Sequence, residues 1–134
     1  MTSRRSIAEV LADARAKLQR LTPHEAHAAQ RSGAVLVDIR PRRDREADGR
    51  LPGGLVVERN VLEWRFDPAS GARLGMASYD LGVIVVCNEG YTSSLAAAAL
   101  QDLGVWRATD IVGGYRAWRN AGLPTLAGAG HAID

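Results

Sequence analysis

The feature that most constrains the fold is a short, unbroken apolar run, VIVVC, at residues 83–87. A strand with one face in water alternates apolar and polar residues, whereas a strand buried on both faces reads as a continuous run rich in Val and Ile. The run AVLVDI at residues 34–39 has the same character. Because such strands must be covered on both sides, the sequence predicts a parallel sheet between two layers of helices.

Helical patterns separate these runs. Residues 6–20 carry apolar side chains at helical spacing, with charged residues between them. Thr22, Pro23 and Glu25 are typical of a helix start, and Gly33 marks the end of that helix. Further along the chain, SSLAAAALQDL and YRAWRNAG predict two more helices.

Two shorter segments complete the predicted sheet. LVVE at residues 55–58 and ATDIVGG at residues 108–114 are expected to be strands, and residues 60–80 to form an irregular connection with one short helix. We expect an α/β fold with a central, mainly parallel sheet of about five strands and helices on both faces.

The expected organisation is one domain with an extension at each end. Residues 1–20 form an extra N-terminal helical extension, residues 21–124 the domain, and residues 125–134 a tail of small residues that is expected to fray. No internal repeat or second domain is evident.

Composition excludes several classes of function. The formal net charge of +2 is too small to indicate nucleic-acid binding, and no run is long enough to span a membrane. A single cysteine cannot form an internal disulfide, so we expect a cytoplasmic protein. His24 and His27 are spaced as zinc ligands can be, but no other histidine or cysteine is near them in sequence, and no metal site is expected.

The single cysteine, Cys87, stands where open α/β sheets bind ligands, at the carboxyl end of a strand. The loop NEGYTS and then a helix follow it. Such a loop can turn its N–H groups toward the sulfur, with Gly90 free to adopt a positive φ, and the helix dipole adds positive potential. Both effects favour a thiolate, so the arrangement favours a nucleophile over an inert buried cysteine.

Four segments in register resemble the single-domain rhodanese, or thiosulfate sulfurtransferase, family. They are LVDIR for the Asp-x-Arg strand end, GRLPGG for the Gly-His-Ile-Pro-Gly-Ala turn, CNEGYTSS for the active-site loop, and VGGYRAWRNAGLP for the C-terminal signature. Together they span about residues 21–124. The resemblance therefore covers nearly the whole predicted domain.

The resemblance implies a mechanism. Cys87 would take the outer sulfur of a donor such as thiosulfate, release sulfite and become a persulfide, without a metal or an organic cofactor. Cyanide, a thiol or a sulfur-accepting protein would then remove the sulfur. Asp38 and Arg40 would be a structural pair that supports the loop. The negative charge of the persulfide would be held by the loop amides of Asn88, Glu89, Gly90, Tyr91, Thr92 and Ser93.

This sequence departs from the family pattern inside the loop. Many rhodaneses carry a basic residue there, whereas residues 88–93 contain none and include Glu89. A carboxylate beside an anionic donor opposes binding and disfavours the thiolate. We expect a cation from another segment to compensate, and Arg59, which follows a predicted strand end, is the first candidate for anion binding.

Two alternatives are open at this point, and a third is not expected. The protein could relay persulfide sulfur to a protein partner while using thiosulfate poorly, which Glu89 favours. It could be a catalytically idle interaction module that keeps the fold, against which the retained Cys87 argues. A Cys-dependent phosphatase needs an arginine six positions after the cysteine, and that position is Ser93, so phosphatase activity is not expected.

Overall fold

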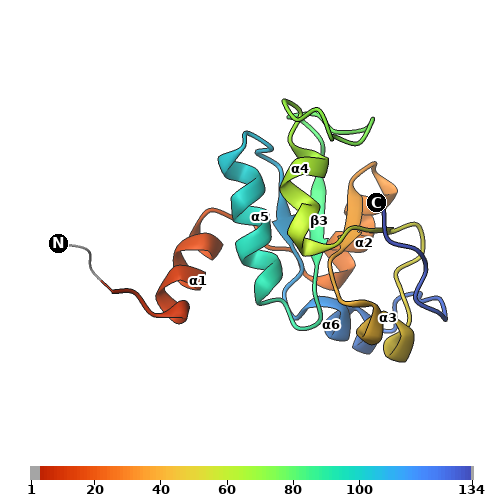
Figure 1. The fold of residues 1–134 in the computed structure, drawn as a ribbon. Coiled ribbons are helices and arrows are strands. Elements are labelled where there is room, and N and C mark those ends of the chain that lie inside the picture. Colours follow the sequence, from red (N-terminus) through yellow and green to blue (C-terminus); the bar gives the residue numbers. More distant parts are fainter. Residues whose placement is uncertain (1–3, 134) are drawn as a thin grey trace.

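The computed structural model describes residues 4–133 (Figure 1). Its centre is a parallel sheet of four strands in the order β2-β1-β3-β4. The strands are β1 (Val35–Asp38), β2 (Leu55–Val56), β3 (Val83–Val86) and β4 (Thr109–Asp110). The α/β class and the parallel sheet are therefore confirmed.

Helices cover both faces of the sheet, as the apolar strands require. On one face, side chains of β1 and β3 pack with α4 (Leu62–Phe66) and α5 (Thr92–Asp102). On the other face they pack with α2 (Pro23–Arg31) and α6 (Gly114–Asn120). The short α3 (Arg42–Asp48) follows β1, and the 3-10 turn η1 (Arg59–Val61) leads into α4. The expected single short helix within residues 60–80 is α4.

An additional helix, α1 (Ile7–Ala16), packs against α5 on the side away from the sheet (Figure 1). Ser6 caps its start and Lys17 caps its end, so the helix is shorter than the one expected over residues 6–20. Residues 18–22 then run alongside β4 toward α2: the Thr109 hydroxyl donates to the Gln19 carbonyl at 2.8 Å, and the Leu21 N–H donates to the Asp110 carbonyl at 3.0 Å. The path of this segment brings the N-terminal extension close to the loop after β3.

The sheet has four strands rather than the expected five. Leu21 lies where a fifth strand would pair with β4, but it makes only an isolated bridge to Ile111. Thr22 caps α2 directly after Leu21, and Pro23 lacks the N–H that a ladder needs. The chain therefore turns into a helix after one bridging residue.

The expectation that the C-terminal tail frays is wrong for residues 125–133, and Asp134 lies outside the described residues. Leu126 pairs with Arg50 in an antiparallel bridge, and Ile133 donates its N–H to the Val56 carbonyl at 2.7 Å. Ala129 is buried between these two contacts. Backbone pairing, which composition does not reveal, holds residues 125–133 against the domain.

We predict that the capping box of α2 makes stability depend on pH. The N–H of Thr22 donates to Glu25 Oε1 at 2.8 Å, and this contact and the Thr22 hydroxyl hold the pKa of Glu25 below its ordinary value of 4.5. A depressed folded-state pKa stabilises the fold above the unfolded pKa, and this stabilisation is lost as the pH falls through the folded pKa. Glu25→Gln should therefore lower the free energy of unfolding at neutral pH, with a deficit that shrinks as the pH falls below 4.5.

Urea unfolding over a pH series measures this difference. Glu58→Gln is the matched control, because the Glu58 side chain is exposed and makes no hydrogen bond within residues 4–133. A deficit for Glu25→Gln that is the same at all pH values would show that the carboxylate charge is not its source.

Candidate active site

Cys87 directly follows β3 at the carboxyl edge of the sheet and is 4% exposed. Its Sγ accepts the N–H of Gly90 at 3.2 Å and the N–H of Ser93 at 3.4 Å. Two of the six loop residues expected to present amides thus contact the sulfur directly. Amides in this position stabilise negative charge on sulfur.

The first peptides of the loop are held by the start of α6. The N–H of Tyr115 donates to the Cys87 carbonyl at 2.9 Å, and the N–H of Arg116 donates to the Asn88 carbonyl at 3.1 Å. In a planar trans peptide the N–H points away from the carbonyl. The N–H groups of Asn88 and Glu89 therefore point away from α6, and they have no acceptor within residues 4–133.

Two glycines make this close contact between loop and helix possible. Gly90 has φ +84°, and a Cβ there would lie 2.9 Å from the Ile111 carbonyl oxygen. A Cβ on Gly114 would lie 2.5 Å from the Cys87 carbonyl oxygen. Both distances are too short for real atoms, so any side chain at either position would push the loop off α6.

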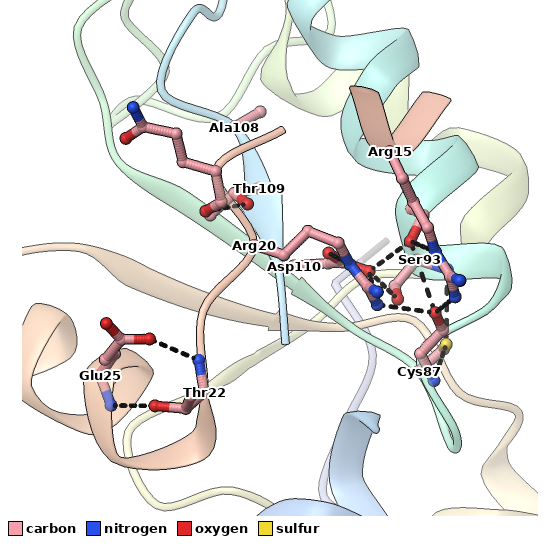
Figure 2. A network of polar contacts seen from close by, with 12 residues as sticks. Arg15, Arg20, Thr22, Glu25, Cys87, Ser93, Ala108, Thr109 and Asp110 are labelled. Carbon is pink, nitrogen blue, oxygen red and sulfur yellow. Dashed lines mark hydrogen bonds and ion pairs between the residues drawn. The ribbon is translucent and has the colours of Figure 1, made fainter. Parts of the chain in front are cut away.

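A buried carboxylate fixes the other end of the loop. Asp110, at the end of β4, is fully buried and accepts hydrogen bonds from the hydroxyls of Ser93 at 2.8 Å and Ser94 at 2.7 Å. Arg20 Nε donates to the same carboxylate at 2.8 Å, which gives the buried charge a partner (Figure 2). Ser93 is thereby held where its N–H reaches Sγ.

Asp38 and Arg40 form a buried pair beside this loop. Arg40 Nε donates to Asp38 Oδ1 at 3.0 Å and Nη2 to Oδ2 at 2.7 Å, in a two-point geometry that fixes both groups. The guanidinium stacks on the ring of Tyr115, 3.7 Å from its centre, and burial raises the pKa of the Tyr115 hydroxyl. The remaining nitrogen, Nη1, is buried and has no hydrogen-bond partner within the described chain.

A shallow cavity of about 290 Å³ lies over the loop. Besides Cys87, its lining includes Arg40 and Asn88, and the buried Oδ1 of Asn88 also lacks a partner among residues 4–133. Larger hollows lie between α1 and α5 and beside β4, but neither contains Cys87. The remaining lining comes from the end of β1, the start of α3 and the loop, through Ile39, Pro41, Asp44, Glu89, Tyr91 and Thr92.

The charged residues singled out from the sequence take different positions. Glu89 lines the cavity, yet its side chain is about half exposed, and Oε1 lies 3.6 Å from Arg116 Nη1. Arg59 does not line the cavity; its Nη1 pairs with Glu63 Oε1 at 2.6 Å, one turn further along the chain. The structure does not bring Arg59 and Cys87 together.

Sequence reasoning missed Arg15, Arg20 and Asp110. Arg15 and Arg20 belong to the segment before the predicted domain, and both donate to the Gly90 carbonyl. Both are so far from the loop in sequence that no pattern indicated their contact with it. The sequence does give a weak indication for Asp110, since a carboxylate inside an apolar strand needs a buried partner.

Neither a membrane span nor a metal site is found among residues 4–133. No helix there combines the length and the apolar character that crossing a membrane requires. The same residues contain no cluster of three or more His, Cys, Asp or Glu side chains that could hold a metal ion. His27 instead packs edge-on against Trp118.

Comparison with known proteins agrees with this geometry. A model of the rhodanese-like domain matches residues 22–121. The chain belongs to the rhodanese-like family. A thiosulfate sulfurtransferase, GlpE, of Stutzerimonas stutzeri (strain A1501) is 31% identical to this rhodanese-like chain over 102 residues, which are 76% of this chain and 85% of that protein.

Solved structures give the same fold. A protein of unknown function from Rhodopseudomonas palustris CGA009, described as a possible tyrosine phosphatase, superposes with a TM-score of 0.83 at 36% identity, over 93% of this chain and 97% of its own. A thiosulfate sulfurtransferase from Pseudomonas aeruginosa superposes with a TM-score of 0.70 at 22% identity, over 91% of this chain and 23% of that one. This second likeness concerns the fold alone.

We predict that Gly90→Ala disrupts the loop. The positive φ alone costs a side chain about 1–3 kcal/mol, and the contact with the Ile111 carbonyl adds to that cost. The free energy of unfolding in urea should fall by at least this amount. Gly71→Ala is the control, because a Cβ there meets nothing within 4 Å, and it should change stability by less than about 1 kcal/mol. Equal stability of Gly90→Ala and wild type would contradict the role given to Gly90.

Proposed function

We propose that this chain is a sulfurtransferase that works through a persulfide on Cys87. The observation that carries the proposal is the pair of amides, from Gly90 and Ser93, that face Sγ at the floor of the cavity. The thiolate attacks the outer sulfur of thiosulfate; a new S–S bond forms, the S–S bond of thiosulfate breaks, and its electron pair leaves with sulfite. The product is the persulfide anion of Cys87 and free sulfite, so atoms and charge balance.

The loop amides would stabilise this persulfide. Its terminal sulfur carries the charge, and the N–H groups of Asn88 and Glu89, which have no acceptor within residues 4–133, are available to it. In the second half-reaction, cyanide, a thiol or a sulfur-accepting protein attacks the terminal sulfur. Cys87 then leaves as a thiolate, ready for another cycle.

Arg40 lines the cavity, but its side chain is fully buried against Asp38, and its Nη1, which has no partner in the described chain, is buried too. Arg40 would therefore meet an anionic donor only if the loop moved aside. Its role in supporting the loop stays a prediction. The anion-binding role of Arg59 also stays a prediction, and it requires Arg59 to leave Glu63.

A relay to or from a protein persulfide is the second candidate. Glu89 favours it, because this carboxylate lines the cavity and repels a dianion such as thiosulfate. A donor that brings its sulfur on a neutral or cationic peptide surface meets no such repulsion. The two candidates share the Cys87 persulfide and differ in the donor.

The Rhodopseudomonas protein is described as a possible tyrosine phosphatase, but phosphatase chemistry fits the present site poorly. A Cys-dependent phosphatase holds phosphate with a two-point arginine contact six positions after the cysteine. Ser93 occupies that position and its hydroxyl donates to Asp110. The site therefore lacks the planar donor that phosphate needs.

The test of the proposal is the mass of the intact protein after incubation with thiosulfate. Wild type should gain one sulfur atom, because the thiolate accepts it, and Cys87→Ser should gain none. Cyanide should then remove the added mass and yield thiocyanate. Matched incubation with sulfite instead of thiosulfate controls for adducts that do not involve a transferable sulfur.

The donor used in the same measurement separates the candidates. A gain with thiosulfate supports a thiosulfate sulfurtransferase, and a gain only with polysulfide or a protein persulfide supports the relay. No gain with any of these donors, together with a Cys87 that does not react with iodoacetamide at pH 7, would leave the idle interaction module.

We also predict that Glu89→Gln improves the use of thiosulfate. Removing the carboxylate from the cavity wall removes a repulsion, and because Glu89 is half exposed and paired with Arg116 the gain should be modest, about three- to tenfold in kcat/KM. The gain should shrink as salt is added. Steady-state kinetics with thiosulfate and cyanide at two ionic strengths measures it.

Asp102→Asn serves as the control for this change. Asp102 is also an exposed, ion-paired carboxylate, but it lies on the far end of α5 from the loop and does not line the cavity. It should leave kcat/KM within about twofold of wild type. A similar gain in both variants would mean that overall charge, and not the position of Glu89, sets the repulsion.

A further inference from the structure

Two arginines from outside the matched family domain reach the active-site loop. Arg15 lies in the last turn of α1, and Arg20 lies in the extended segment that follows; the family model begins at residue 22. Figure 2 shows both side chains converging with Asp110 and Ser93 beside Cys87. The N-terminal extension thus makes polar contacts with the loop in addition to those with Asp102, Thr109 and Asp110.

Both guanidinium groups donate to a single backbone atom. Arg15 Nη2 lies 2.7 Å from the Gly90 carbonyl oxygen, and Arg20 Nη2 lies 3.0 Å from it. Arg15 also donates through Nε to the Ser94 hydroxyl at 3.1 Å, and its guanidinium lies 5.4 Å from the centre of the Tyr91 ring. Arg15 therefore contacts three residues of the loop and the first turn of α5.

We propose that Arg15 and Arg20 are positioning residues for sulfur transfer, which hold the Gly90 carbonyl outside the loop so that the amides inside it face Cys87. This inference rests on the proposed function, because it names the groups that prepare the Cys87 loop for the same step. Neither arginine touches the sulfur. Both act through the peptide that they bind.

The geometry of the peptide explains how a bond to Gly90 acts inside the loop. The peptide between Gly90 and Tyr91 is planar and trans, so fixing its carbonyl toward the arginines points the Tyr91 N–H away from them. The Gly90 N–H, which donates to Sγ, belongs to the preceding peptide. The two peptides meet at the Gly90 Cα, where φ is +84°. Holding the carbonyl limits rotation of this left-handed residue, and with it the direction of the amide at Sγ.

The arginines also supply the positive charge that the loop lacks. Residues 88–93 contain Glu89 and no cation, whereas two guanidinium groups and the Asp110 carboxylate leave one net positive charge behind Gly90. Acting through the Gly90 carbonyl, this charge stabilises the negative charge on the sulfur during its transfer.

Arg15 is the residue to change. Arg20 partners the buried Asp110, so its removal leaves a buried charge unpaired and destabilises the fold. Arg15 makes no ion pair within residues 4–133, and Arg15→Gln removes its charge while keeping a polar, shorter side chain. Lys17→Gln is the matched control, because Lys17 also joins the end of α1 to α5, through Asp102 at 3.4 Å, but does not touch the loop.

The experiment measures two rates in wild type, Arg15→Gln, Arg15→Lys and Lys17→Gln. The first is the single-turnover rate of persulfide formation over a range of thiosulfate concentrations, and the second is the rate of Cys87 alkylation by iodoacetamide at pH 7. Arg15→Gln should lower the maximal rate of persulfide formation about tenfold, as expected for loss of a charged hydrogen bond, and lower alkylation in parallel. The half-saturating thiosulfate concentration should change less than about twofold, because Arg15 does not line the cavity.

The controls make the inference falsifiable. Arg15→Lys should recover part of both rates because it restores the charge, and Lys17→Gln should match wild type. An unchanged maximal rate in Arg15→Gln overturns the inference, and so does an equal loss in Lys17→Gln, which would assign the effect to docking of α1. If wild type forms no persulfide, the proposed function fails; the alkylation rates still decide whether Arg15 acts on Cys87.

Discussion

The site depends on one constraint, that the carbonyls of the Cys87 loop point outward. A planar trans peptide that turns its carbonyl toward one side turns its N–H toward the other, so a donor that holds the carbonyl also fixes the direction of the N–H. Here the donors come from two directions: the start of α6 binds the carbonyls of Cys87 and Asn88, and the N-terminal segment binds that of Gly90. The hydroxyl of the neighbouring Ser94 adds only a long contact to the Gly90 carbonyl, at 3.4 Å, so the shorter hydrogen bonds to these three carbonyls come from parts of the chain far away in sequence.

Buried charge holds those parts together. Asp110 joins Arg20 to the serines at the start of α5, and Asp38 joins Arg40 to the end of β1. A buried carboxylate is costly without such partners, and breaking one partner away leaves the other uncompensated. The two carboxylates lie on β4 and β1, on either side of β3, and so brace the strand end that carries Cys87.

The sequence predicted the parts of this arrangement that are local. The apolar run of β3, the cysteine at its end and the glycine in the loop all lie within a few residues, and the periodicity of the flanking segments placed the sheet between helices. It could not predict the contacts of Arg15 and Arg20 with Gly90, which close distances of 75 and 70 residues along the chain. Arg59 was a reasonable candidate from its place after a strand, but its nearest carboxylate, Glu63, lies one helical turn away and pairs with it. Two other predictions were wrong. The expected fifth strand does not form because the chain turns into a helix at Pro23, and the tail is not free because Ile133 pairs with the backbone of Val57.

The isolated bridges at Leu21 and Ile133 have a consequence for the protein in a crowded solution. An outer strand with unpaired N–H and carbonyl groups is a template for pairing with another chain, and natural proteins cover or shorten such edges. Leu21 lies beside the end of β4, and Ile133 lies beside the end of β2, so each outer strand of this sheet has a neighbour from one end of its own chain. The two terminal segments, which add almost nothing to the sheet as strands, thereby guard it against edge-to-edge aggregation.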